Sequence, residues 1–270
     1  MQPRRFPPRF VRERVEEISF AKLVPSALTL MGLASGVTAI RFAMEHEWKF
    51  AVGAILLAML FDMLDGRAAR QLGADTRFGA QLDSLADLVS FGIAPALIAY
   101  NWTLSGLGEI GWIAAVIFCV CCAIRLARFN IQALRDEGAT ERNPYFTGMP
   151  TPAGACLVLL PLLFSFQFKD PAFQLPLYSC AIALATSVLM VSRLPTPSIK
   201  HLHFERHYRI VAGLVVLVTA GALIYRPWAT LAVGVVLYVL SIPVTAFVSA
   251  RARNAALDED EDEEEDLSIA

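Results

Sequence analysis

The chain has 270 residues, of which 56% are hydrophobic, and its mean hydropathy is +0.53. Soluble domains are roughly 45–50% apolar, so this composition argues against a soluble protein and favours a membrane protein. The net charge of −2 depends on a run of nine acids at 258–266, because 23 basic residues face only 16 acidic ones elsewhere. The five cysteines lie in apolar runs without zinc-ligand spacing, which argues against a zinc site or a disulfide framework.

Three regions follow one another along the chain. Residues 1–22 are basic, with arginines interleaved among apolar side chains, which fits either an amphipathic helix lying on the inner leaflet or an unstructured basic leader. Residues 23–250 form one transmembrane domain, because the loops within it are too short for a second folded domain. Residues 251–270 form an acidic tail, which we expect to be disordered and solvated.

The transmembrane domain contains eight apolar segments of near-spanning length. They cover about residues 23–43, 50–70, 79–100, 110–130, 150–168, 173–192, 209–225 and 228–249. The sequence therefore predicts an all-α fold, a polytopic membrane helical bundle with about eight transmembrane helices.

The distribution of basic residues over the loops predicts the orientation in the membrane. With the N-terminus in the cytoplasm, 19 of the 23 basic residues lie on the cytoplasmic side, and the far side keeps only Arg41, Lys49, Lys169 and Arg226. Eight spans then leave both termini inside. We expect an integral protein of the cytoplasmic (inner) membrane, with the loop between the second and third segments facing the cytoplasm.

Four aspartates flank that loop, where apolar segments end. Asp62 and Asp65 are three residues apart and Asp83 and Asp87 are four apart, so each pair shares one face of a helix. Ionisable side chains near a bilayer cost at least ~2.5 kcal/mol, which indicates a function for them. If the two helices face each other, the carboxylates form an all-oxygen site for one or two divalent cations, Mg²⁺ or Mn²⁺. The alternative is that they form salt bridges with Arg67, Arg70 and Arg77.

The spacing around these aspartates resembles a family signature. Asp-x-x-Asp-Gly-x-x-Ala-Arg, then eight residues, then Gly-x-x-x-Asp-x-x-x-Asp is similar to the signature of the CDP-alcohol phosphotransferases. Every fixed position is filled, by Asp62, Asp65, Gly66, Ala69, Arg70, Gly79, Asp83 and Asp87. The resemblance implies an enzyme that uses a CDP-linked lipid and releases CMP.

The same resemblance implies roles for individual residues. Two Mg²⁺ or Mn²⁺ ions would be held by Asp62, Asp65, Asp83 and Asp87, and Asp87 would also be the catalytic base that takes the proton of the incoming hydroxyl. The residues implied to bind the nucleotide of the CDP-lipid are Ser26, Thr29, Gly66, Arg70, Thr76 and Gly79. Relatives usually read Pro-Asn-x-x-Thr in the first segment, where this chain has Ser26 in place of the asparagine. Ser26 and Thr29 could instead hydrogen-bond to their own helix backbone.

Two later stretches resemble the phosphatidylserine synthase branch of that family. Arg125-Leu-Ala-Arg128-Phe-Asn130 ends the fourth segment, and a Gly- and Pro-rich run over 143–154 leads into the fifth. The resemblance implies CDP-diacylglycerol as the donor and L-serine as the acceptor. A guanidinium suits the serine carboxylate, so Arg125, Arg128 and Asn130 are candidate acceptor contacts. Both arginines could instead anchor the helix at the inner surface, and Asn130 could cap it.

Two other functions stay open from the sequence. The acceptor could be choline, glycerol-3-phosphate or inositol, although choline has no carboxylate and would favour an aromatic cage. Outside this class, the aspartates could serve a divalent-cation transporter, which would leave Gly66, Arg70 and Gly79 unexplained. Homodimers are common in the family, and the sequence does not decide between a monomer and a homodimer. The surroundings are the lipid bilayer, and no nucleic acid polymer is expected as a partner.

Overall fold

The computed structural model describes residues 20–74, 76–136, 146–168, 170–192, 195–196 and 206–243. All of the acidic tail and nearly all of the basic N-terminal segment lie outside these residues. The described part is helical except for one short strand pair, β1 (Phe146–Thr147) with β2 (Pro195–Thr196). The predicted all-α class is therefore confirmed, and each of the eight predicted apolar segments overlaps helix within the described residues.

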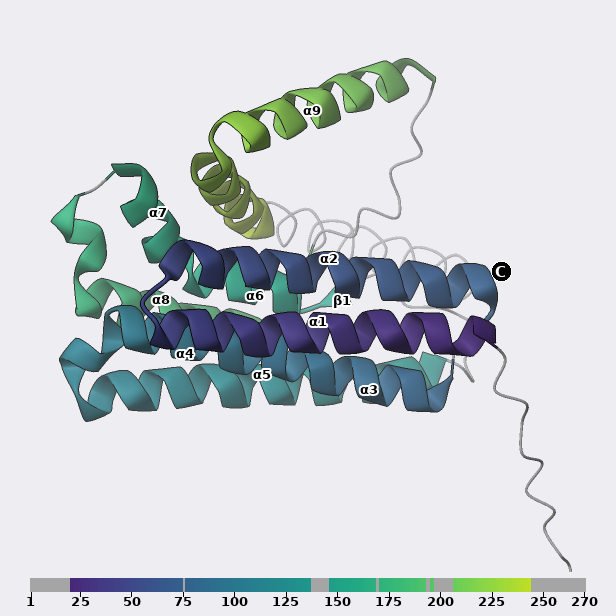
Figure 1. Cartoon of the computed structure of the whole chain (residues 1–270), viewed down its shortest axis with the longest axis horizontal. Helices are drawn as coiled ribbons and strands as arrows, with labels where there is room; N and C mark the ends of the chain where they lie inside the picture. The colour runs from purple at the N-terminus through teal and green to yellow at the C-terminus, as the bar shows by residue number, and fades with distance from the viewer. Residues whose placement is uncertain are drawn as a thin grey trace, which may run out of the picture.

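The first two helices form an antiparallel hairpin, α1 (Phe20–Met44) and α2 (Trp48–Leu72), which lie side by side along their length (Figure 1). The tight turn between them has His46 at a positive φ of 60°, and Arg41 pairs with Glu45 at 2.9 Å beside it. Gly73 ends α2 in the left-handed conformation that glycine adopts without strain. This hairpin carries Asp62 and Asp65 to the same end of the molecule as the start of α3.

The third predicted segment is a continuous helical rod with a change of pitch in its middle. It consists of α3 (Arg77–Asp87), the π-helix η1 (Leu88–Ile93) and α4 (Ala94–Trp102). The π-helix begins directly after Asp87, and such wide turns are frequent at functional sites. It packs against α1 and α5.

The remaining helices cover the other side of this rod. A short 3₁₀ turn, η2 (Leu104–Leu107), leads into α5 (Glu109–Asp136), which packs on α8 (Pro176–Val191). The fifth predicted segment is bent by 45° between α6 (Thr151–Val158) and α7 (Leu160–Phe168), which η3 (Pro171–Gln174) follows. Pro161 explains the bend, because proline lacks the N–H of the helix ladder and clashes with the preceding turn.

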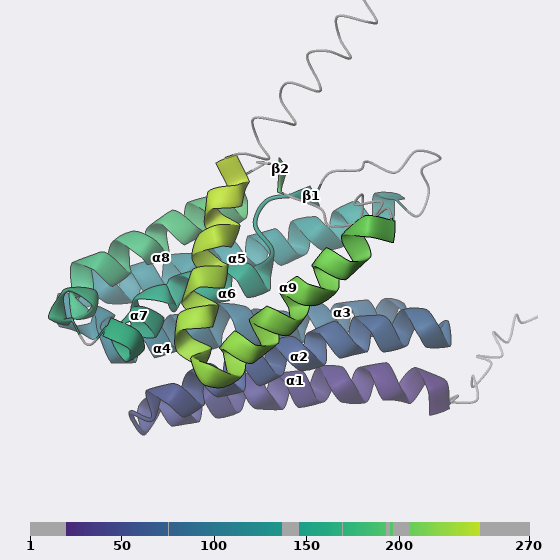
Figure 2. The same cartoon turned by 90° about the horizontal axis from the view of Figure 1, so that it is seen from above.

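The last two helices are α9 (Arg206–Tyr225) and the helix Pro227–Pro243. Figure 2 shows both at an angle to the bundle, with the helix Pro227–Pro243 drawn in yellow. The second of them is fixed to the bundle by an edge-on contact of Trp228 with Phe166 at 5.0 Å between ring centroids.

Within the described residues, three helices are long and apolar enough to cross a membrane, Leu23–Met44, Arg77–Trp102 and Glu109–Gln132. The bent pair α6 and α7 makes a fourth if it counts as one span. Helix α2 contains Lys49, the aspartates and the following arginines, and α8 and Pro227–Pro243 are short. The chain is thus an integral membrane protein with several apolar spans, and the number eight stays a prediction.

Candidate active site

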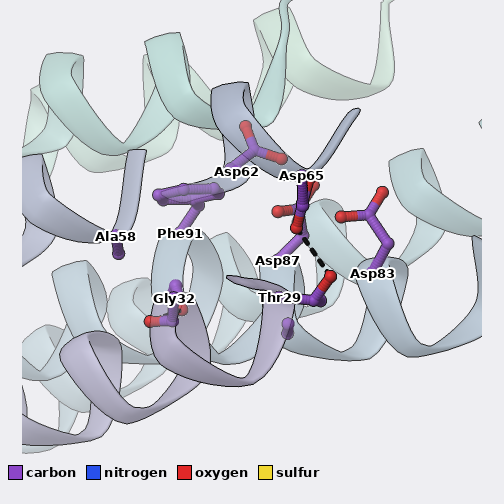
Figure 3. A pocket seen from close by; sticks show the side chains of 10 residues that line it. Thr29, Gly32, Ala58, Asp62, Asp65, Asp83, Asp87 and Phe91 are labelled. Carbon is purple, nitrogen blue, oxygen red and sulfur yellow. Dashed lines mark hydrogen bonds between the residues drawn. The ribbon is translucent and has the colours of Figure 1, made fainter. Parts of the chain in front are cut away.

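Three aspartates from two helices meet at one point. Asp62 comes from α2, Asp83 and Asp87 come from α3, and one carboxylate oxygen of each lies within 4.8 Å of the others. All three side chains are half-buried, in a small pocket also lined by Gly32, Ala58 and Phe91 (Figure 3). The structure therefore brings the two predicted pairs onto facing helix surfaces.

Asp65 lies beside this group with a partner of its own. Its side chain is 5% exposed and accepts a 2.6 Å hydrogen bond from the hydroxyl of Thr29, which α1 contributes (Figure 3). The same hydroxyl lies 3.0 Å from the carbonyl of Pro25, one turn earlier in α1. Thr29 thus both contacts its own backbone and tethers α1 to the aspartate site.

The electrostatics of the group favour a bound cation. At 4.8 Å, two carboxylates repel by roughly 3 kcal/mol at an effective dielectric constant near 20. Within the described residues, none of the four aspartates forms a salt bridge with Arg67, Arg70 or Arg77, which removes the alternative explanation from the sequence. Carboxylate oxygens are the donors that Mg²⁺ and Mn²⁺ prefer, so the residues fit a divalent ion.

The loop ahead of α3 is held by the hydroxyl of Thr76. Its oxygen accepts a 3.0 Å hydrogen bond from the backbone N–H of Gly79 and so caps α3. A side chain at Gly79 would bring its Cβ to 3.1 Å from that oxygen. Both residues therefore have a local structural role, which fixes where Asp83 lies one turn further on.

Gly66 and Arg70 lie one helical turn apart on α2. A Cβ at Gly66 would be 3.6 Å from the nearest guanidinium nitrogen of Arg70, and no side chain of another described residue, its chain neighbours apart, would lie within 4 Å of it. The Arg70 side chain is exposed. The guanidinium therefore lies next to backbone that a ligand can approach. Ser26 is half-buried on α1, three residues before Thr29.

Close packing of α1 on the π-helix holds these two elements together next to the aspartate site. Ser90 donates a hydrogen bond of 3.2 Å to the carbonyl of Gly32, and a Cβ at Gly36 would lie 2.4 Å from the Ser90 oxygen and 2.7 Å from its Cα. Only glycine at position 36 permits this approach. Gly32 and Gly36 have the four-residue spacing of small residues at helix contacts in membranes, a signal that was present in the sequence and that our sequence analysis missed.

Arg125 connects the two later motifs. It is 8% exposed on α5, its Nε donates to the carbonyl of Met149, and its Nη1 donates to the hydroxyl of Thr151 at 3.2 Å. Gly148, with a φ of 85°, makes the preceding turn against the end of α8. The guanidinium also interacts electrostatically with Asp87. The buried Arg125 is therefore within electrostatic reach of the aspartate site.

Arg128 and Asn130 have protein partners instead. Nη1 of Arg128 donates to the carbonyl of Val191 at 2.8 Å, which satisfies the C-terminal end of α8. Asn130 accepts a 3.0 Å hydrogen bond from Ser84, which lies on α3 next to Asp83. These contacts give both residues a role in joining helices.

Comparisons with known proteins identify relatives of this chain. The family described as "CDP-alcohol phosphatidyltransferase" matches residues 22–192, and "CDP-alcohol phosphatidyltransferase 2" matches residues 207–243. The first match contains all four aspartates.

Three relatives share the printed name CDP-diacylglycerol–serine O-phosphatidyltransferase. The protein of Mycobacterium leprae is 38% identical over 224 residues, covering 82% of this chain and 74% of the relative. The Bacillus subtilis protein is 37% identical over 185 residues, covering 68% of this chain and 92% of the relative. The Helicobacter pylori protein is 32% identical over 219 residues, covering 81% of this chain and 88% of the relative. Among solved structures, a phosphatidylinositol phosphate synthase of Mycobacterium tuberculosis with CDP-DAG bound matches at 22% identity and a TM-score of 0.45, covering 65% of this chain and 92% of that one.

Proposed function

Because this chain belongs to the CDP-alcohol phosphatidyltransferase family, we propose that it transfers the phosphatidyl group of CDP-diacylglycerol to L-serine, giving phosphatidylserine and CMP. The observation that carries the proposal is the meeting of Asp62, Asp83 and Asp87 at one point. The names of the relatives from three genera support serine as the acceptor.

The carboxylate group is proposed to hold divalent metal, Mg²⁺ or Mn²⁺. When bound, such ions would neutralise the pyrophosphate of the CDP-lipid and stabilise the phosphate that leaves with CMP. Asp62, Asp83 and Asp87 would be ligands through the oxygens that already face one another. Asp65 would use the oxygen that Thr29 does not occupy, while Thr29 fixes the orientation of its carboxylate.

In the proposed reaction, the serine hydroxyl oxygen attacks the β-phosphorus, which carries the diacylglycerol. A new P–O bond to serine forms, and the bond from that phosphorus to the bridging oxygen of CMP breaks. Asp87 takes the proton from the hydroxyl. Its carboxylate suits this role because it belongs to the aspartate group and interacts electrostatically with the buried Arg125.

The nucleotide contacts are proposed around the start of α3 and the end of α2. Backbone at Gly66 would approach a phosphate, with Arg70 beside it as a hydrogen-bond donor. Thr76 and Gly79 would shape the loop under the nucleotide, and Ser26 would reach it from α1 beside Thr29.

For the acceptor, the contacts favour Arg125 over the other two candidates. Arg125 is buried and interacts electrostatically with Asp87, so its guanidinium would bind the serine carboxylate. Arg128 is exposed and bonded to α8, so we propose that it positions that helix. Asn130 would hold α3 in place through Ser84.

The loop charges support a site that opens on the cytoplasmic side of the inner membrane, with both termini inside. Cytoplasmic Mg²⁺ and serine, and the CDP-lipid of the inner leaflet, would reach the aspartates from there. One domain over 23–250 would contain the complete catalytic apparatus.

The test is incorporation of labelled L-serine into lipid by detergent-purified protein with CDP-diacylglycerol and Mn²⁺. Asp87→Asn should lower the rate by at least about 10²-fold while binding of CDP-diacylglycerol persists. The matched control is Asp170→Asn, since Asp170 caps η3 away from the aspartate group and asparagine caps equally well. Full activity of Asp87→Asn would remove Asp87 as the base, and no incorporation by the folded wild-type protein would contradict the proposal.

A further inference from the structure

The helix Pro227–Pro243 contains Tyr238, a residue that none of the sequence motifs includes. Ala232 and Ile242 of this helix are buried, and Tyr238, which lies between them in the sequence, packs against the core. In Figure 2 this yellow helix runs across the bundle, with its C-terminal end on the side of β1 and β2. Residues 207–243 match a family description of their own, which is separate from the one that matches the aspartates.

The hydroxyl of Tyr238 is buried and has no hydrogen-bond partner among the described residues. Nearly all buried polar atoms in proteins are satisfied, and a buried hydroxyl that lacks a partner destabilises the fold. No other buried side-chain nitrogen or oxygen in the described part of the chain is in this state. An unsatisfied hydroxyl at this position therefore indicates a ligand group.

The charged group that interacts with Tyr238 is Arg125. Its guanidinium interacts electrostatically with both Tyr238 and Asp87. Nε and Nη1 are engaged by Met149 and Thr151, whereas the described residues give Nη2 no partner. A guanidinium has five N–H donors, so a donor edge is left over. The phenolic O–H adds a further donor beside it.

Two donors of this kind, one of them cationic, suit a carboxylate. We propose that Tyr238 is a specificity residue for the acceptor, whose hydroxyl binds the carboxylate of L-serine together with the free edge of Arg125. This inference deepens the proposed function and rests on it. With its carboxylate held there, the serine would direct its hydroxyl toward Asp87. Acceptors without a carboxylate would leave both donors unpaired, and sites built for a polar group reject analogues that lack it.

The experiment uses Tyr238→Phe in the full-length protein, because this change removes only the hydroxyl and keeps the ring in its packing. Serine-dependent release of CMP is measured over a range of L-serine and of L-serinamide, which has an amide in place of the carboxylate. We expect the KM for L-serine to rise about 10-fold or more, as loss of a hydrogen bond to a charged group predicts. The KM for CDP-diacylglycerol should stay unchanged, and kcat/KM for L-serinamide should be equal in both proteins.

Tyr100→Phe is the matched control, since Tyr100 lies on α4 in edge-on contact with Trp112, and its kinetics should equal those of the wild type. A purely structural role for Tyr238 gives the opposite pattern, because removing an unsatisfied hydroxyl raises thermal stability without changing the KM for serine. That result, or an equal loss with L-serine and L-serinamide, would overturn the inference. Wild-type protein without serine-dependent CMP release would instead refute the proposed function itself.

Discussion

Replacing Thr29 by valine tests whether α1 contributes to the metal site through Asp65. Valine keeps the shape of threonine and removes the hydroxyl that donates to Asp65 at 2.6 Å. That length is typical of a bond to a charged carboxylate, which contributes about 1.5–3 kcal/mol. Because both side chains are at least 94% buried, water does not replace the lost donor easily. Loss of a hydrogen bond that orients a metal ligand weakens metal binding by about 10–100-fold.

The assay is the initial rate of CMP release as a function of Mn²⁺ concentration at saturating lipid and serine. Thr29→Val should shift the half-saturating Mn²⁺ concentration upward by about 10–100-fold. Thr29→Ser keeps the hydroxyl and should stay close to the wild-type curve, which separates the hydrogen bond from packing. An unchanged Mn²⁺ dependence in folded Thr29→Val would show that the bond to Asp65 does not orient a metal ligand.

Two further experiments test the packing of α1 on the π-helix and the need for a metal ion. Gly36→Ala puts a methyl group 2.7 Å from the Cα of Ser90, so α1 must move from the π-helix. We expect a loss of about 1–3 kcal/mol in stability and lower activity, read by thermal unfolding and CMP release. Gly53→Ala, where the new methyl group meets nothing within 4 Å, should behave like the wild type. Chelation with EDTA should stop CMP release, and added Mg²⁺ or Mn²⁺ should restore it; activity that survives complete chelation would exclude a metal-dependent reaction.

The helical class and the aspartate pairs could be predicted from the sequence because both depend on local periodicity. Apolar runs locate the helices, and spacings of three and four place each carboxylate pair on one face. If the two helices face each other, the pattern predicts that four carboxylates meet. The structure brings Asp62, Asp83 and Asp87 together, while Asp65 is bonded to Thr29.

Features that depend on contacts between distant segments were not predictable in the same way. The π-helix after Asp87 and the tight approach of Ser90 to Gly36 require the packing of α1 on η1. The partners of Arg125 lie more than 20 residues away in the chain. The amino-acid sequence alone therefore left it equally open whether this arginine anchors the helix or binds substrate. The 45° bend in the fifth segment had a local signal in Pro161, although hydropathy alone predicts one continuous apolar segment there.

The most direct test of the central claim is CMP release by the purified protein with CDP-diacylglycerol and Mn²⁺, offering L-serine, glycerol-3-phosphate, inositol and choline separately. Our account predicts release with L-serine alone, and loss of that release in Asp87→Asn. Release with a different alcohol would keep the aspartate chemistry and contradict serine as the acceptor. Folded protein that releases no CMP with any of them would contradict the account as a whole.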